Sequence, residues 1–282
     1  MSENAFIRPS MPLACVFGDP IEHSRSPSLH EGALRHLQLP GRYLAFQVGI
    51  PSLDVALRAI MALGFRGCNL TAPLKIAARR LLDDEDSDVR HIGAANTIVF
   101  EDGLRIGHNT DARGLVAALV EACGIDIAGR RVLVVGSGGA ARAAVWAMLG
   151  AGAAQVLVTG RRIDRVVELV ATFEGHCLVC EQTQGLSVDL VINATTAGMR
   201  GGGSEVDSAI DLAGFGEIGA VYDMVYDPVL TPLMASARAM GVPAFNGLTM
   251  LAGQARFAFE HFFGHLASLD VFLASTELTI IE

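Results

Sequence analysis

The sequence predicts an α/β protein with two domains, the second of which contains a doubly wound parallel sheet. Short apolar segments alternate with helical patterns, which is typical of parallel strands connected by helices. A glycine-rich turn follows the apolar segment 131–135 and opens a helix, as the first turn of a doubly wound sheet does. The 282 residues, 51% of them hydrophobic and 18% charged, suffice to fill two modest cores.

The first domain is expected to be an α/β substrate domain that spans residues 1–110. Its predicted strands are 13–17, 43–48, 66–70 and 97–100, and its predicted helices are 27–37, 53–63 and 73–82. The acidic run 83–88 predicts a solvated loop. The last helices, within 248–282, are expected from the chain order to fold back and complete this domain.

The second domain is expected to span residues 111–247. A connecting helix is predicted at 112–123. Further strands are predicted at 131–135, 155–159, 189–193, 220–226 and 243–245, and helices at 140–149, 164–173 and 231–240. Two helical stretches, 249–263 and 266–275, follow this alternating pattern.

Composition and charge exclude several classes of function. The net charge of −9 argues against a surface for nucleic acid or an anionic membrane. Glycines and Arg142 interrupt the most apolar stretch, 132–160, so no run reaches the roughly 18–20 residues that span a bilayer. Without a secretory signal, the five cysteines are expected to be reduced thiols in the cytoplasm. The pair Cys177 and Cys180 lacks a second pair, and the histidines lack metal spacing, so no metal is expected.

The glycine loop fits the pattern G-x-G-x-x-A between a strand and a helix. Gly136 would permit the tight turn, Gly138 would let the backbone approach a pyrophosphate, and Ala141 would allow close helix packing. The helix N-terminus would offer N–H groups to the phosphates. The residues expected to contact a dinucleotide here are Gly136, Ser137, Gly138, Gly139 and Ala140. A structural turn in a nucleotide-free domain is the alternative.

The end of the next strand indicates which dinucleotide is bound. The chain continues as Thr159, Gly160, Arg161 and Arg162, with no carboxylate before Asp164. An acid there would bind the ribose hydroxyl of NAD, whereas guanidinium groups suit the 2′-phosphate of NADP. The sequence therefore predicts NADP, with Thr159, Arg161 and Arg162 at the site. The alternative is that both arginines are solvated.

Two hydroxyls in the first domain flank a helix start and would bind a carboxylate. Ser24 and Ser26 lie in a polar loop after the first strand. The alternatives are that Ser26 caps a helix beginning at Pro27 and that Ser28 and Glu31 form a capping box.

A lysine and an aspartate are candidates for proton transfer. Lys75 lies at the expected start of a helix near Pro73, where the helix dipole and burial would lower its pKa. Asp111 would place a carboxylate opposite Lys75. The alternatives are an exposed lysine and an aspartate that caps the next helix.

Taken in order, eight segments resemble the shikimate dehydrogenase family from about residue 13 to residue 264. They are the Ser24 and Ser26 region, 69–75, 95–97, 109–111, the glycine loop, 193–199, 222–226 and 247–254. The resemblance implies reversible reduction of 3-dehydroshikimate to shikimate by NADPH, a step of aromatic amino-acid and chorismate biosynthesis, with the active site in a cleft between two domains. The implied partners are small molecules alone, and the chain would act as a monomer or homodimer.

The resemblance also implies roles for individual residues. Ser24 and Ser26 would hold the ring carboxylate, and Lys75 with Asp111 would form the catalytic pair. The residues implied to bind the acid or its hydroxyls are Thr71, Asn96, Tyr226 and Gln254. Met224 and Gly247 would lie near the nicotinamide.

Three departures from the family pattern leave alternatives open. Leu70 replaces a common valine, Ala112 and Arg113 follow Asp111 in place of glycine, and residues 160–162 replace Asn-Arg-Thr. A quinate or quinate/shikimate dehydrogenase using NAD or both cofactors is the nearest alternative. A non-catalytic dinucleotide sensor would not need Lys75 and Asp111. An enzyme like methylene-folate dehydrogenase would not explain the paired serines.

Overall fold

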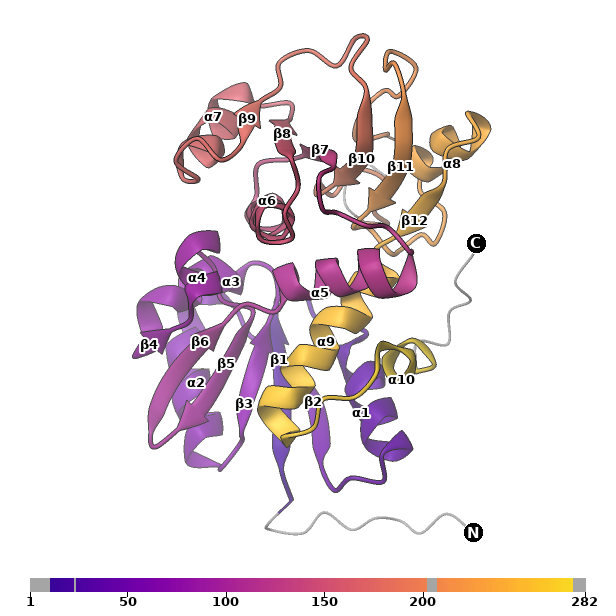
Figure 1. The fold of residues 1–282 in the computed structure, drawn as a ribbon. Helices are drawn as coiled ribbons and strands as arrows, with labels where there is room; N and C mark the ends of the chain where they lie inside the picture. The colour runs from indigo at the N-terminus through magenta and orange to yellow at the C-terminus, as the bar shows by residue number, and fades with distance from the viewer. Residues whose placement is uncertain (1–10, 23, 202–206, 276–282) are drawn as a thin grey trace. The chain divides into compact units, whose positions relative to one another are not determined.

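The computed structural model describes residues 11–22, 24–201 and 207–275, and the chain divides into two compact units (Figure 1). Unit 1 contains the described residues up to Val89, then Ala94–Thr110, then residues 255–275. Unit 2 contains Arg90–Gly93 and the described residues of Asp111–Gln254. Each unit has its own six-stranded sheet, which confirms the predicted α/β class.

The sheet of unit 1 is mixed. Its strands are β1 (Leu13–Gly18), β2 (Arg42–Gln47), β3 (Gly67–Leu70), β4 (Asp84–Glu85), β5 (Thr97–Glu101) and β6 (Leu104–His108), in the order β2-β1-β3-β5-β6-β4. β1 runs parallel to β2 and β3, whereas β5 is antiparallel to both β3 and β6. The ends of β1, β3 and β6 therefore lie at the same edge as the start of β5.

Helices cover both faces of this sheet. Successive side chains of β1 point to opposite faces, so they pack in two separate cores. Phe17 packs in one core with Leu53 and Leu57 of α2, whereas Val16 packs in another with Phe262 of α9. The helices that lie wholly or partly in unit 1 are α1 (Ser26–His36), α2 (Leu53–Ala62), α3 (Leu74–Ala77), α4 (Ser87–Ile92), α9 (Leu248–Phe263) and α10 (Leu269–Leu273). Two 3₁₀ turns, η1 (Ile50–Ser52) and η2 (Ala78–Leu81), also lie in unit 1. α4 and α9 each contribute residues to both units.

The sheet of unit 2 is parallel throughout and doubly wound. Its strands are β7 (Arg131–Val135), β8 (Gln155–Thr159), β9 (Leu178–Val179), β10 (Val188–Asn193), β11 (Ile218–Asp223) and β12 (Ala244–Asn246), in the order β12-β11-β10-β7-β8-β9. The helices are α5 (Asp111–Ala117), continued as a π turn η3 (Ala118–Ala122), α6 (Gly139–Gly150), α7 (Ile163–Ala171) and α8 (Pro232–Ala239). Winding reverses between β7 and β10, where such sheets bind ligands at their carboxyl edge.

Three predicted elements were wrong in part, and a specific hydrogen bond accounts for each difference. The helix expected at 73–82 is the four-residue α3 followed by η2, since the Lys75 carbonyl accepts from the Ala95 N–H at 3.0 Å. The strand expected at 220–226 ends at Asp223, whose carboxylate accepts from the Val225 N–H at 3.0 Å. The acidic run was expected to be a loop, but it contains β4 and the start of α4, because Asp86 accepts from the Val89 N–H at 2.8 Å.

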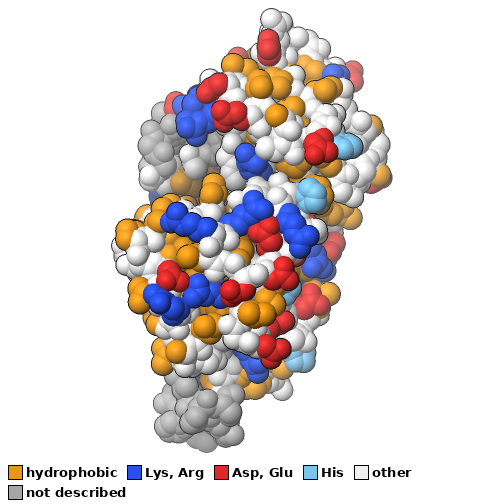
Figure 2. All heavy atoms as spheres, turned by 90° about the vertical axis from the view of Figure 1, so that its left-hand side faces the viewer, with side chains coloured by type: hydrophobic (Ala, Val, Ile, Leu, Met, Phe, Trp, Pro, Cys, Tyr) orange, Lys and Arg blue, Asp and Glu red, His pale blue; other side chains and the backbone are white. Residues whose placement is uncertain are grey.

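Charged side chains of both signs are mixed on the surface. Figure 2 shows acidic and basic side chains interspersed over one face. Several of the charged side chains of unit 1 form ion pairs, including Arg79 with Glu85 and Arg105 with Asp54. Within the described ranges, no helix has the length and apolar character needed to cross a bilayer.

Candidate active site

The polar segments of unit 1 meet at one edge of its sheet. The loops that follow β1 and β3 touch, because the Thr71 N–H donates to the Phe17 carbonyl at 2.9 Å. A Cβ placed on Gly18 would collide with the Thr71 side chain. The segment before β5 and the segment after β6 reach this same edge, since β5 runs antiparallel to its neighbours. The topology thus gathers side chains that are far apart in the sequence.

Asn96 joins the last two segments through its side chain. Its Nδ2 donates to Thr110 Oγ1 at 2.9 Å, and its Oδ1 accepts from the Thr110 N–H at 2.9 Å. Thr97 Oγ1 donates to the same oxygen at 2.8 Å. Asn96 is only 1% exposed, so these bonds satisfy a buried amide and fix the loop that leads to Asp111.

Asn69 is a site residue that the sequence analysis did not single out. It lies in the fully buried strand β3, where its Nδ2 donates to Thr97 Oγ1 at 2.9 Å and to the Asn96 carbonyl at 3.2 Å. An asparagine within a buried strand is itself a signal, because a buried amide must find several partners. Asn69 thereby links β3 to the polar start of β5.

The structure around Ser24 and Ser26, here called the serine loop, contradicts both capping interpretations. The residue before α1 is Arg25, and no side chain caps this helix. Ser24 Oγ accepts from the Ser26 N–H at 3.4 Å, and Glu31 accepts from the Tyr43 N–H at 2.7 Å. Ser26 therefore does not cap α1, and Glu31 fastens the helix to β2.

The predicted catalytic residues flank the Asn96 region along the chain. The Lys75 carbonyl is bonded to Ala95, and Asp111 directly follows Thr110. Lys75 is half-buried, and Asp111 is 8% exposed at the start of α5. The dipole argument for Lys75 was wrong, because α3 has only four residues and so little cumulative dipole. Pairing of Lys75 with Asp111 stays a prediction.

The glycine loop of unit 2 lies at the carboxyl edge of its sheet. Gly136 has φ of +133°, and a Cβ there would lie 3.0 Å from the Ala194 carbonyl oxygen. Its N–H donates to the Thr159 carbonyl at 2.8 Å. A Cβ on Gly138 or Gly139 would meet nothing within 4 Å, and no side chain caps α6. The open backbone before an uncapped, twelve-residue helix fits a bound pyrophosphate.

Two arginines follow β8 beside this loop. Arg161 and Arg162 are exposed, and a Cβ on Gly160 would lie 3.8 Å from Gly136. The guanidinium groups thus stand at the end of the strand where an acid would mark an NAD site. The other departures lie elsewhere, since Leu70 is buried in a core of unit 1 and Arg113 is exposed on α5.

The loops after β10 and β11 are joined by a buried carboxylate. Asp223 accepts from Asn193 Nδ2 at 2.8 Å and from Thr231 Oγ1 at 2.6 Å. Burial raises the pKa of Asp223, although these hydrogen bonds oppose the rise. The Met224 N–H donates to the Asn193 carbonyl at 3.0 Å, and a Cβ on Gly247 would collide with the Met224 backbone. Met224 and Gly247, both expected near the nicotinamide, are therefore brought together.

The other two predicted ligands of the acid lie in unit 2. Tyr226 is half-buried beyond β11. Gln254 lies on α9 where that helix meets α5, and a Cβ on Gly114 would lie 2.5 Å from the Gln254 nitrogen. The Gln254 Nε2 donates to the Leu251 carbonyl at 3.2 Å in its own helix. Their contact with an acid stays a prediction.

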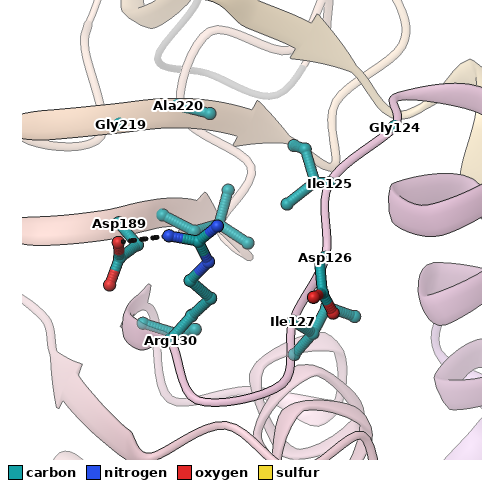
Figure 3. A pocket seen from close by; sticks show the side chains of 10 residues that line it. Gly124, Ile125, Asp126, Ile127, Arg130, Asp189, Gly219 and Ala220 are labelled. Carbon is teal, nitrogen blue, oxygen red and sulfur yellow. Dashed lines mark hydrogen bonds and ion pairs between the residues drawn. The ribbon is translucent and has the colours of Figure 1, made fainter.

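A separate hollow of about 230 Å³ lies at the opposite edge of the unit 2 sheet (Figure 3). It is lined by the starts of β7, β10 and β11, and Arg130 pairs there with Asp189 at 3.1 Å. Both charged side chains are largely exposed. The glycine loop follows the other end of β7, so this hollow is not the predicted cofactor site.

The described residues hold no metal-binding group of three or more His, Cys, Asp or Glu side chains. All five cysteines are free thiols, and burial raises the pKa of Cys177 to about 11. A high thiol pKa disfavours the thiolate that metal binding or redox chemistry needs.

Family models match parts of both units of the chain, and known proteins match most of its length. Residues 16–98 match the family model described as shikimate dehydrogenase substrate binding domain, and residues 118–200 match shikimate / quinate 5-dehydrogenase. A protein named shikimate dehydrogenase (NADP(+)) from Geobacter sulfurreducens is 40% identical over 256 residues, covering 87% of this chain and 88% of that protein. One of the same name from Magnetococcus marinus is 38% identical, covering 92% and 93%. The crystal structure of shikimate 5-dehydrogenase from Thermus thermophilus in complex with NADP(H) and shikimate has a TM-score of 0.86 and 34% identity, covering 94% and 98%.

Proposed function

The chain belongs to the shikimate dehydrogenase family, and we propose that it reduces 3-dehydroshikimate to shikimate reversibly with NADPH. The observation that carries this proposal is the polar cluster at the edge of the unit 1 sheet. There the segments that resemble the family's substrate site are joined by hydrogen bonds through Asn69 and Asn96. Fold alone would not support a substrate, because function resides in the site.

The two parts of the chain have different tasks in this proposal. Residues 1–110, completed by 248–282, supply most of the ligands of the acid, and residues 111–247 bind the dinucleotide and add Asp111 and Tyr226 to the acid site. Ser24 and Ser26 hold the ring carboxylate with their hydroxyls. The residues that bind the ring or its hydroxyls are Thr71, Asn96, Tyr226 and Gln254.

NADPH, when bound, supplies the hydride that reduces the ketone. Lys75 delivers a proton to the oxygen that becomes the hydroxyl, and in the reverse direction it removes that proton. Asp111 accepts a hydrogen bond from the substrate and orients the Lys75 ammonium. Buried Asp111 is anchored through Thr110 and Asn96, so its position is set before the acid binds.

The dinucleotide is held by backbone and by guanidinium groups. The residues that would hold the pyrophosphate are those of the loop and helix start, Gly136, Ser137, Gly138, Gly139 and Ala140. Thr159 would contact the adenosine, and Arg161 and Arg162 would bind the 2′-phosphate, which suits guanidinium groups. Met224 and Gly247 would contact the nicotinamide.

A cytoplasmic location fits this chemistry, because NADPH and free thiols both belong to a reducing compartment. The partners are then the acid and the dinucleotide. The chain acts as a monomer or homodimer, and light scattering would distinguish these two states by their mass.

The test is a steady-state assay of the purified protein that follows NADPH by its near-ultraviolet absorbance. Two acids, shikimate and quinate, are each combined with NADP and with NAD. Turnover of shikimate with NADP and little with NAD is the expected result. Faster turnover of quinate, or preference for NAD, would replace the proposal with the quinate alternative. A protein that binds NADP but turns over neither acid would contradict both.

A further inference from the structure

A fully buried tyrosine of unit 2 holds the first turn of helix α9. Tyr222, on β11, is 0% exposed, and its hydroxyl oxygen accepts the Met250 N–H at 3.1 Å. The same oxygen lies within hydrogen-bond distance of Thr249 Oγ1, at 2.8 Å. Tyr222 therefore bonds to two successive residues of α9 that lie 27 and 28 positions further along the chain.

The start of α9 depends on side chains from outside the helix. The first N–H groups of any helix have no partner within it. Asn246 Oδ1 accepts the Leu248 N–H at 3.1 Å, and the phenol of Tyr222 accepts that of Met250. Leu248 and Met250 are buried, so a donor that loses its partner here is costly.

The phenol can make both of its bonds at once. Burial raises the pKa of Tyr222 well above its usual range, so the hydroxyl keeps its proton at neutral pH. A phenol has one proton to donate and lone pairs that accept. Tyr222 can therefore donate to Thr249 while it accepts from Met250.

The next turn of α9 carries a predicted ligand of the acid. Gln254 lies four residues after Met250, one turn further along the helix. The backbone of this turn packs directly on α5, since a Cβ on Gly114 would lie 2.5 Å from the Gln254 nitrogen. A Cβ on Gly253 would likewise lie 2.6 Å from the Gly114 carbonyl oxygen. The beginning of α9 is thus held at two points, by the phenol and by α5.

The contact with α5 also relates Gln254 to the predicted catalytic carboxylate. Asp111 begins α5, and Gly114 lies about 4.5 Å further along the helix axis. The orientation of α9 about this contact therefore sets where Gln254 stands relative to Asp111. The Gln254 Nε2 donates to the Leu251 carbonyl at 3.2 Å, so the direction of the side chain follows the backbone of its own helix.

We propose that Tyr222 is a positioning residue for binding of the acid, which acts by fixing the first turn of α9, and through it Gln254, with its bonds to Thr249 and Met250. The inference rests on the proposed function, in which Gln254 is a ligand of the acid. It requires no contact between Tyr222 and the acid.

The dinucleotide should be affected much less than the acid. Gly247, expected at the nicotinamide, is held by a separate bond, because its N–H donates to the Val225 carbonyl at 3.1 Å. Leu248, the next residue, is held by Asn246. Loss of the Tyr222 hydroxyl leaves both of these bonds in place.

Replacement Tyr222→Phe tests this role, because it removes the hydroxyl and keeps the ring. The KM for shikimate should rise about fivefold, an effect of the size that one hydrogen bond contributes. The kcat, and the Kd for NADP measured by calorimetric titration, should stay within about twofold of their original values. An unchanged KM for shikimate, or an equal weakening of NADP binding, would overturn the proposal.

Two variants of Thr249 test the second bond while the Met250 N–H keeps its partner. Thr249→Ser retains the hydroxyl that meets the phenol, and Thr249→Val replaces it with a methyl group of similar size. The serine variant should have the original KM for shikimate, and the valine variant should raise it. Equal KM values for the two variants would contradict action through Thr249 and overturn the proposal.

Val221→Ala is the matched control for loss of stability. Val221 precedes Tyr222 in β11, is 0% exposed and packs in a core with Leu133 and Leu233. Its truncation leaves a cavity and should lower the melting temperature without changing the KM for shikimate. If it raises this KM as much as Tyr222→Phe does, the effect is general destabilisation and the proposal fails.

A double-mutant cycle with Gln254→Ala tests the route of the effect. When Gln254 has lost its amide, Tyr222→Phe should raise the KM for shikimate much less than it does in the original protein, because the two changes act on one contact. Independent, multiplying effects would refute action through Gln254. Failure of the proposed function would instead appear as absent turnover of shikimate by the unmodified enzyme, and would remove both proposals.

Discussion

A fully buried histidine should make the stability of unit 1 sensitive to acid. His30 is 0% exposed, among Tyr43, Phe259, Phe262 and Phe272, and neither ring nitrogen has a hydrogen-bond partner. Burial lowers the pKa of His30 from 6.5 to about 3. The folded protein therefore holds a neutral imidazole at pH values where the unfolded chain holds a charged one.

The sign and size of the effect follow from this pKa. Between pH 6.5 and about 3 the unfolded chain binds a proton that the folded chain does not, so stability is lost as the pH falls. Above that window the ring is neutral in both states and adds no pH dependence. At about 1.4 kcal/mol per pH unit, the loss is about 2 kcal/mol at about pH 5 and about 5 kcal/mol near pH 3.

His30→Phe removes the titrating group and retains a ring to stack on Tyr43. Urea unfolding followed by far-ultraviolet circular dichroism gives the free energy of unfolding of both proteins from about pH 8 to about pH 5. Other titrating groups cancel in the difference between the two proteins. The variant should gain about 2 kcal/mol relative to the original protein as the pH falls over this range.

The control is His36→Gln, an exposed histidine on the same helix. Because this side chain is exposed, its replacement should change the free energy of unfolding by no more than about 0.5 kcal/mol. A difference for His30→Phe that is flat with pH would show that His30 takes up a proton in the folded state. The reasoning from burial would then be refuted.

Three further predictions concern the proposed active site. Lys75→Ala should lower kcat at least about a hundredfold and change the KM for shikimate much less, because proton transfer acts in the transition state; near-normal kcat in steady-state assays would remove Lys75 from the mechanism. Arg161→Asp should weaken NADP more than about thirtyfold and NAD little, as measured by calorimetric titration, and equal effects would mean that Arg161 does not contact the 2′-phosphate. Gly136→Ala should weaken NADP binding and destabilise the fold by about 1–3 kcal/mol, since φ is +133° and Ala194 lies close. A Cβ on Gly139 would meet nothing within 4 Å, so Gly139→Ala should have the melting temperature of the original protein. Equal melting temperatures of the two variants would contradict this argument.

The sequence predicted unit 2 better than unit 1 for a physical reason. Strands of a parallel sheet are buried on both faces, so they read as short apolar runs bounded by turns. β8 was predicted at its observed bounds, and the glycine loop was recognisable because its chemistry is local. In unit 1, β6 was missed because its residues are mostly half-buried or exposed and include a charge. A weakly buried strand of a mixed sheet therefore has no comparable run of apolar residues in the sequence.

The bonds that shape the candidate site are long-range, and no local pattern contains them. The sequence placed Ser26, Asn96 and Lys75 in site segments, but it could not show that the Lys75 carbonyl is taken by Ala95 and so ends the helix early. Tyr43 looked like an ordinary strand residue, since tyrosine is common in strands. Its partner Asn69 lies 26 residues further along the chain.

These bonds explain why polar side chains can occupy the core behind the site. A buried amide or hydroxyl costs about 1–3 kcal/mol when its partner is removed, but little when every member is bonded. Tyr43, Asn69, Thr97, Asn96 and Thr110 satisfy one another, so the loss of one leaves another unpaired. The same network that stabilises the sheet edge therefore fixes the loops at the site, and mutations behind the site should change affinity for the acid as well as stability.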